Sequence, residues 1–292
     1  MQRGASAGGY EDRWWAAPDG VWLHARDYPG PSDRPPIICL PGLTRNARDY
    51  QALAERLAGR WRVIAVDFRG RGESKPAKDP ATYVPQTYAA DLNEMLAAFG
   101  IERFVAVGTS LGGLVTMMMA ADAPGRVVGA VLNDVGPEIE AAGLQRIRGY
   151  VGRASSFPTW MHAARALAEA NRDVHPRFAV ADWLDMAKRL YRLTPAGKIT
   201  LDYDLKIAEP FRTAEGAAPP DLWPAYAALG DAPVLVVRGA LSDVLAPATA
   251  ARMAATLPSV ELVEIPACGH APTLAEPEAS AAIDRLLARV AA

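Results

Sequence analysis

The chain has 292 residues, of which 50% are hydrophobic and 22% charged, and its formal net charge is −2. A half-apolar chain of this length can bury a large core in one or two domains, which excludes global disorder. The balanced charge, without a basic block, argues against a nucleic-acid partner. There is no apolar run of membrane-spanning length and no apolar stretch of a signal peptide near the first residue. We therefore expect a cytoplasmic protein with no membrane partner.

Short apolar runs rich in Val and Ile recur along the chain. Runs of this kind, without polar alternation, are typical of strands buried on both faces of a parallel sheet. Helical spacing follows the early runs, at residues 50–57 and 88–99. The alternation predicts the α/β class, with a mostly parallel central sheet flanked by helices and an antiparallel edge pair near residues 21–28. The predicted buried strands are Ile37–Leu40, Val63–Val66, Phe104–Val107, Val127–Leu132, Val234–Val237 and Val260–Ile265.

The alternation stops after residue 136. From about residue 138 to residue 226 there is no run typical of a buried strand, and amphipathic helical patterns take its place. We interpret this stretch as a helical cap inserted after the sixth strand. The predicted organisation is a first core part at residues 1–136, the cap at 137–228 and a second core part at 229–292. The helical patterns of the cap cover residues 144–151, 160–170, 181–193 and 202–209.

The strongest motif is Gly108-Thr109-Ser110-Leu111-Gly112, a Gly-x-Ser-x-Gly sequence. It follows a buried strand and precedes a Met-rich helical pattern, which is the context of a nucleophile elbow. The serine of an elbow occupies a strained turn with positive φ, and small neighbours let the strand and the helix approach closely. The N-terminus of the following helix favours negative charge. The motif therefore predicts Ser110 as a nucleophile and the Leu111 N–H as an oxyanion donor.

Four further motifs follow predicted strands, and together with the elbow they resemble the α/β-hydrolase fold superfamily over nearly the whole chain. The resemblance is to its capped serine esterase or lactonase branch. The four motifs are Leu40-Pro41-Gly42-Leu43, the D-x-R-G-x-G-x-S turn from Asp67 to Ser74, the segment from Gly239 to Pro247, and Cys268-Gly269-His270-Ala271-Pro272.

The first of these motifs corresponds to the oxyanion loop of the superfamily. The resemblance implies that the Leu43 N–H is the second oxyanion donor. Pro41 stands where the superfamily usually has His, which leaves the shape of the loop open. Thr44, Arg45 and Asn46 follow, and they either direct polar groups at the site or form a solvated loop.

A serine hydroxyl needs a base to take its proton, and the base needs a third group to orient it. The resemblance implies the chain order serine, acid, histidine. His270 is the only histidine after the insertion, so we expect it to be the base. Asp243 fits the superfamily pattern G-x-x-S-D-x-x-x-P, whereas Asp134 follows an earlier strand where some members carry the acid. We favour Asp243, and interpret Asp134 as a brace for the loop that enters the cap.

We expect neither a metal ion nor a cofactor. The sequence has no H-E-x-x-H motif, no Cys/His cluster, no phosphate-binding Gly-rich loop ending in Lys and no dinucleotide fingerprint. The sheet order that the resemblance implies would place Cys39 and Cys268 several strands apart, too far for a disulfide. Cys268 could be reactive because it lies two residues from His270, but a buried thiol is the simpler interpretation.

The expected activity is hydrolysis of a carboxylic ester or lactone through an acyl-Ser110 intermediate. The same residues could also perform C–C bond hydrolysis or perhydrolysis, or persist in a low-turnover ligand-binding receptor. The expected partner is a small-molecule substrate, and the sequence leaves a homodimer open. Aromatic residues and Met in the cap would either line an apolar pocket or hold the cap on the core. The candidates for substrate binding are Trp160, Met161, Trp183, Trp223 and Tyr226.

Overall fold

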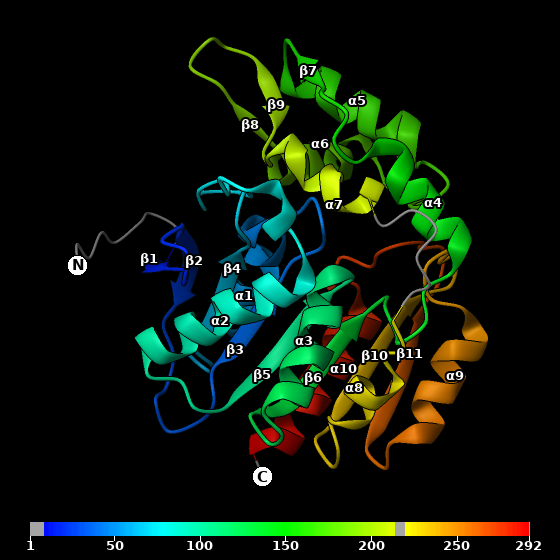
Figure 1. The fold of residues 1–292 in the computed structure, drawn as a ribbon. Coiled ribbons are helices and arrows are strands. Elements are labelled where there is room, and N and C mark those ends of the chain that lie inside the picture. Colours follow the sequence, from blue (N-terminus) through cyan, green and yellow to red (C-terminus); the bar gives the residue numbers. More distant parts are fainter. Residues whose placement is uncertain (1–8, 214–219, 292) are drawn as a thin grey trace.

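The computed structural model describes residues 9–213 and 220–291, and its centre is an eight-stranded sheet (Figure 1). The strand order is β1-β2-β4-β3-β5-β6-β10-β11. The pairs β1–β2 and β2–β4 are antiparallel, and all other neighbours in this sheet are parallel. The predicted α/β class with a mostly parallel sheet is therefore confirmed. The strands are β1 Glu11–Ala16, β2 Trp22–Tyr28, β3 Ile37–Leu40, β4 Val63–Asp67, β5 Phe104–Thr109, β6 Val127–Asn133, β10 Val234–Gly239 and β11 Val260–Ile265.

The burial of the strands follows their position in the sheet. Every residue of β3, β4 and β10 is buried, because helices cover both faces of these inner strands. The expectation that β11 is buried on both faces is wrong. This strand forms the edge of the sheet, and Leu262 is 39% exposed.

Helices of the core pack on the two faces of the sheet and form two apolar clusters. On one face lie α1 Gln51–Leu57 and α10 Pro277–Ala291. The other face carries α2 Pro85–Phe99, α3 Leu111–Asp122, α8 Trp223–Ala227 and α9 Pro247–Thr256. Short 3₁₀ turns occur at Ala47–Tyr50, Pro80–Thr82 and Leu205–Ile207.

The segment between β6 and α8 forms a separate layer above the sheet (Figure 1). Its helices α5 and α6 pack on each other around their own apolar cluster, which includes Leu167 and Trp183. We refer to this layer as the cap. Its elements are α4 Ala141–Tyr150, β7 Ser156–Phe157, α5 Trp160–Asn171, α6 Val180–Leu190, β8 Tyr191–Leu193, β9 Ile199–Leu201 and α7 Ala208–Thr213.

Two features of the cap differ from the sequence expectation. The cap contains a three-stranded antiparallel sheet of order β7-β9-β8, whereas only helices were expected. Its strands have two or three residues each, too few to show an alternating pattern in the sequence. In addition, α8 packs against α3 of the core, although it falls within the cap predicted at residues 137–228. The predicted domain boundaries otherwise stay a prediction.

Over residues 9–213 and 220–291, no helix has both the length and the apolar character needed to cross a lipid bilayer.

Candidate active site

The turn between β5 and α3 has the geometry of a nucleophile elbow. Ser110 occupies this turn with φ 52° and ψ −115°, a strained conformation for a residue with a side chain. The neighbouring glycines allow the close packing that the turn needs. A Cβ atom on Gly112 would lie 1.9 Å from the Leu40 carbonyl oxygen, and one on Gly108 would lie 2.5 Å from the Gly112 carbonyl carbon. The backbone here thus accepts only glycine at both positions.

His270 contacts the Ser110 hydroxyl directly. Its Nε2 atom lies 2.9 Å from Ser110 Oγ, and its side chain is largely buried. The loop after β11 that carries His270 is held in place from β6, because the Asn133 amide donates to the Pro272 carbonyl at 2.9 Å. A neutral imidazole at this distance can accept the hydroxyl proton through Nε2.

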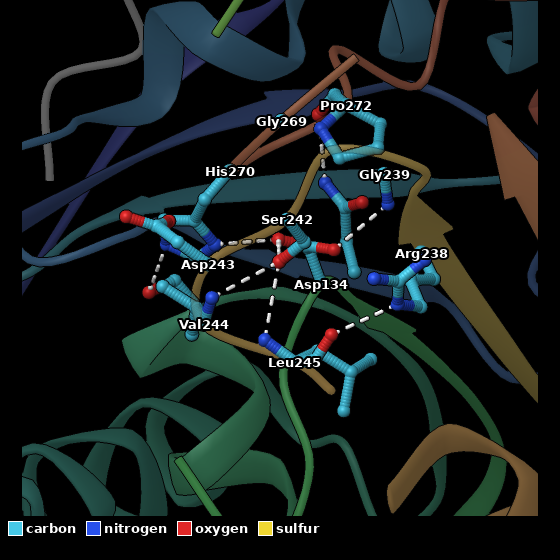
Figure 2. A network of polar contacts seen from close by, with 12 residues as sticks. Asp134, Arg238, Gly239, Ser242, Asp243, Val244, Leu245, Gly269, His270 and Pro272 are labelled. Carbon is cyan, nitrogen blue, oxygen red and sulfur yellow. Dashed lines mark hydrogen bonds and ion pairs between the residues drawn. The ribbon is translucent and has the colours of Figure 1, made fainter. Parts of the chain in front are cut away.

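Asp134, at the end of β6, is the acid that orients His270 (Figure 2). The distance between His270 Nδ1 and Asp134 Oδ2 is 2.7 Å. Asp134 is fully buried, and its carboxylate also accepts hydrogen bonds from the Gly239 N–H at 2.8 Å and from the Ser242 hydroxyl at 2.6 Å. These bonds fix the carboxylate and satisfy a charge that would otherwise be costly to bury.

The expectation that Asp243 orients His270 is therefore wrong. Both carboxylate oxygens of Asp243 accept from the Arg146 guanidinium of α4, at 2.5 and 2.8 Å. Hydrogen bonding from Arg146 also lowers the pKa of Asp243. The preceding residue, Ser242, is the one that turns inward to Asp134 in the loop after β10. The Ser-Asp pattern marks the correct loop, but its serine contributes to the site and its aspartate binds the cap.

The predicted oxyanion donors lie next to the nucleophile. Leu111 is the first residue of α3, so its N–H has no partner within the helix. The loop with Leu43 is held beside the elbow, since the Tyr50 hydroxyl contacts both the Leu40 carbonyl at 2.6 Å and Thr109 Oγ1 at 2.9 Å. Pro41 is compatible with this arrangement. The roles of Leu43 and Leu111 as donors stay a prediction.

A cavity of about 560 Å³ opens over Ser110 and His270, between the core and the cap. Within the described part of the chain, its lining includes none of the five residues that were expected to bind substrate. Trp160 and Trp183 pack inside the cap, and Met161 is 37% exposed. Trp223 donates to Glu138 at 2.6 Å, and the buried Tyr226 hydroxyl donates to the Met253 carbonyl at 2.8 Å. These five assignments to substrate binding are therefore wrong: the four aromatic side chains pack within the fold, and Met161 lies on the surface.

Tyrosines and arginines line the cavity instead. Tyr150, Tyr191 and Tyr203 come from the cap, and their rings combine apolar surface with a hydroxyl. Of the three polar residues after β3, Thr44 and Arg45 line the cavity, whereas Asn46 is buried and donates to the Arg189 carbonyl at 2.9 Å. The sequence offered little signal for the cap residues, because its pattern does not tell which face of a helix meets the core. The arginines of the lining are Arg45, Arg146, Arg153 and Arg189.

His175 lines the cavity and contacts the buried Cys268. Cys268 Sγ lies 3.7 Å from His175 Nδ1. Burial raises the pKa of the Cys268 thiol to about 12, so it is not a nucleophile at neutral pH. Burial and the charges of Arg45 and Arg189 lower the pKa of His175 to about 4. Cys39 and Cys268 are both free and buried.

Comparisons with known proteins agree with this architecture. The family model for the alpha/beta hydrolase fold matches residues 35–277. The chain belongs to this family. A crystal structure of an alpha/beta hydrolase from Novosphingobium aromaticivorans is similar with 57% identity and a TM-score of 0.93, and the match covers 98% of this chain and 100% of that one.

Two relatives with named activities are hydrolases. A 3-hydroxybutyrate-oligomer hydrolase of Cupriavidus necator is 35% identical over 82% of this chain and 84% of its own length. A 2-(acetamidomethylene)succinate hydrolase of Mesorhizobium japonicum is 29% identical over 84% of each chain. Family membership and these relatives identify the protein as a hydrolase of the alpha/beta hydrolase fold.

Proposed function

We propose that this hydrolase cleaves a carboxylic ester of a small-molecule substrate through an acyl-Ser110 intermediate, with Ser110, His270 and Asp134 as its catalytic triad. The observation that carries the proposal is the continuous hydrogen-bonded chain of these three residues, 2.9 Å from Ser110 to His270 and 2.7 Å from His270 to Asp134. Serine, base and buried acid are the arrangement that activates a hydroxyl nucleophile.

The geometry supports a two-step reaction. His270 Nε2 takes the Ser110 proton while Oγ attacks the ester carbonyl, and Asp134 stabilises the imidazolium that forms. The N–H groups of Leu43 and Leu111 stabilise the negative charge on the carbonyl oxygen. The tetrahedral intermediate then collapses, and His270 returns the proton to the departing alcohol. Water, deprotonated by His270, releases the acid from the acyl enzyme and restores the serine.

The ester assignment is supported by the relative from Cupriavidus necator. Its named substrate is an oligomer of 3-hydroxybutyrate, whose units are joined by ester bonds. The cavity volume of about 560 Å³ is in the range of small-molecule sites in proteins. A lactone would undergo the same steps, with the alcohol remaining attached to the acyl group.

A pair of variants tests the proposal. We expect the wild type to hydrolyse 4-nitrophenyl butyrate and Ser110→Ala to lose about 10⁴- to 10⁶-fold in kcat, because the nucleophile is removed. Ser32→Ala, at an exposed residue outside the cavity lining, is the control and should match the wild type. A fluorophosphonate should label Ser110 in the wild type. If the wild type shows no turnover and no labelling, the proposal is overturned. That result would favour a ligand-binding receptor of this fold.

A further inference from the structure

The wall of the cavity carries more positive than negative charge. Four arginines line it, and Asp49 is the one carboxylate of its lining in the described part of the chain. Arg146 is neutralised from outside the lining by Asp243, with two hydrogen bonds. Arg45 makes two hydrogen bonds to Asp49, at 2.5 and 2.7 Å. Arg189 Nε lies 3.9 Å from Asp49 Oδ1, which is beyond hydrogen-bonding distance.

The Arg189 guanidinium has unused hydrogen-bonding capacity. Its Nε atom is buried and has no hydrogen-bond partner within the described residues. A buried donor without a partner is costly, and a carboxylate accepts from a guanidinium with two parallel hydrogen bonds. Burial and the neighbouring Arg45 charge both lower the pKa of Arg189, which remains charged at neutral pH. The Arg189 side chain lines the cavity and is 26% exposed, so a substrate anion can reach its guanidinium and accept hydrogen bonds from it.

Both arginines line the cavity that opens over Ser110, Arg45 from the core loop after β3 and Arg189 from the cap. A Cβ atom on Gly42 would lie 3.3 Å from Arg45 Cγ and 3.8 Å from Ser110 Cβ, so the first part of the Arg45 side chain lies close to the nucleophile. Arg189 comes from the last turn of α6, and its carbonyl accepts from Asn46 of the same loop at 2.9 Å. A ligand of modest length could thus contact the arginines and Ser110 together.

From this arrangement we propose that Arg189, together with Arg45, forms a carboxylate-binding subsite, and that the preferred substrates are esters that carry a carboxylate a few atoms from the scissile bond. The inference rests on the proposed ester hydrolysis at Ser110 and names its substrate class. Arg189 binds the carboxylate, Arg45 adds positive charge, and Asp49 holds Arg45 in position.

The test compares two esters that differ in one terminal group. Mono-4-nitrophenyl adipate ends in a carboxylate, and 4-nitrophenyl hexanoate ends in a methyl group on an acyl chain of the same length. We expect the wild type to have the higher kcat/KM for the adipate ester. Arg189→Gln should lower kcat/KM for that ester about 10- to 100-fold, mainly through KM, and leave the hexanoate ester within about threefold.

Arg165→Gln is the matched control, because it removes an exposed arginine of the same cap outside the cavity lining. This variant should leave kcat/KM unchanged for both esters. Arg189→Lys keeps the charge but loses the planar pair of donors, so we expect an intermediate loss on the adipate ester. Equal losses on both esters in Arg189→Gln, or no loss on either, would overturn the subsite.

A binding measurement keeps the subsite testable apart from turnover. Free adipate should raise the Tm of the wild type more than neutral adipamide does, and Arg189→Gln should abolish the difference. If Ser110 proves inert but adipate still stabilises the wild type selectively, the proposed function fails and the anion site stands. If neutral esters are hydrolysed but adipate gives no selective stabilisation and no kinetic preference, the anion site fails and the proposed function stands.

Discussion

The core and the cap build the two walls of one cavity in different ways. On the core side, the Ser110, His270 and Asp134 side chains follow β5, β11 and β6, and backbone or buried polar contacts hold each of them. On the cap side, Arg189 and Tyr191 project from the end of a short helix and the start of a three-residue strand. The positions of Ser110, His270 and Asp134 therefore depend on the ends of strands in the core. The positions of the residues that line the rest of the cavity depend on how the cap is oriented.

The cap is oriented by polar contacts with the same core loops that form the site. The Arg48 guanidinium donates to the Arg189 carbonyl and to the buried Asp202 carboxylate, at 2.9 and 2.6 Å. The Gly269 N–H, next to His270, donates to the Val174 carbonyl of the cap at 2.6 Å. A shift of the cap would therefore disturb both the lining and the loop of the base.

The largest expected effect separates the two aspartates near the base. Asp134→Asn should lower kcat about 10⁴-fold, because an amide can hold the imidazole in the wrong tautomer and cannot stabilise the imidazolium. Asp243→Asn removes an acid that pairs with the cap, and should lower kcat by less than about tenfold. Steady-state kinetics with 4-nitrophenyl butyrate measures both. The reverse ranking would return the acid's role to Asp243.

A glycine in each region tests how much tighter the core is than the cap. Gly112→Ala would place a methyl group against the Leu40 carbonyl, and should lower the free energy of unfolding by about 3 kcal/mol. Gly149→Ala lies in α4 with open space around the new atom, and should raise it by about 0.5 kcal/mol. Urea unfolding measures both. Equal costs at the two positions would contradict the difference in packing.

Arg48 should matter for the orientation of the cap. Arg48→Met leaves Asp202 buried with only Arg192, at 3.6 Å, as its other cationic partner among the described residues, and should cost about 2 kcal/mol of unfolding free energy. We also expect a higher KM, because Arg189 and Tyr191 lose a contact with the core. Arg192→Met removes a mostly exposed partner and should cost less than about 0.5 kcal/mol. Thermal unfolding measures the change in stability of both variants, and steady-state kinetics measures the change in KM.

Two buried histidines should respond to pH in opposite directions. In the cap, burial and nearby arginines hold the pKa of His175 at about 4, below the ordinary 6.5. The unfolded chain therefore binds the extra proton between these values, and stability rises with pH over that window. In the core, burial alone would lower the pKa of His24, but the hydrogen bond and the charge of Asp67 raise it above 6.5. The contribution of His24 to the free energy of unfolding is complete below pH 6.5. It is lost as the pH rises through the raised pKa of His24.

Unfolding free energies from about pH 4.5 to about pH 8 test this pair. The free energy of unfolding of the wild type, relative to that of His175→Gln, should increase as the pH rises toward 6.5. The free energy of unfolding of the wild type, relative to that of His24→Gln, should decrease as the pH rises above 6.5. The slopes carry the information, because His24→Gln also loses hydrogen bonds to Asp67 and Asp12 and will lower stability at every pH. Parallel slopes would contradict the opposite environments.

The sequence alone determined the strands of the core, the elbow at Ser110 and the histidine loop. Each rests on a local requirement: an apolar run for a buried strand, or a glycine where a Cβ atom meets backbone, as at Gly112. Such requirements leave a mark within a few residues of sequence. The order of the chain also limited the acid to two candidates, Asp134 and Asp243.

Only the tertiary structure decided between these two and assigned the lining of the cavity. Asp134 and Asp243 both follow parallel strands, and the choice depended on Arg146, a residue of the cap about a hundred positions from Asp243 that occupies its carboxylate. The aromatic residues of the cap were expected at the substrate, yet burial of apolar surface places them inside the cap or on α8. Which side of a helix faces a cavity depends on contacts between distant segments, and no local pattern records that choice.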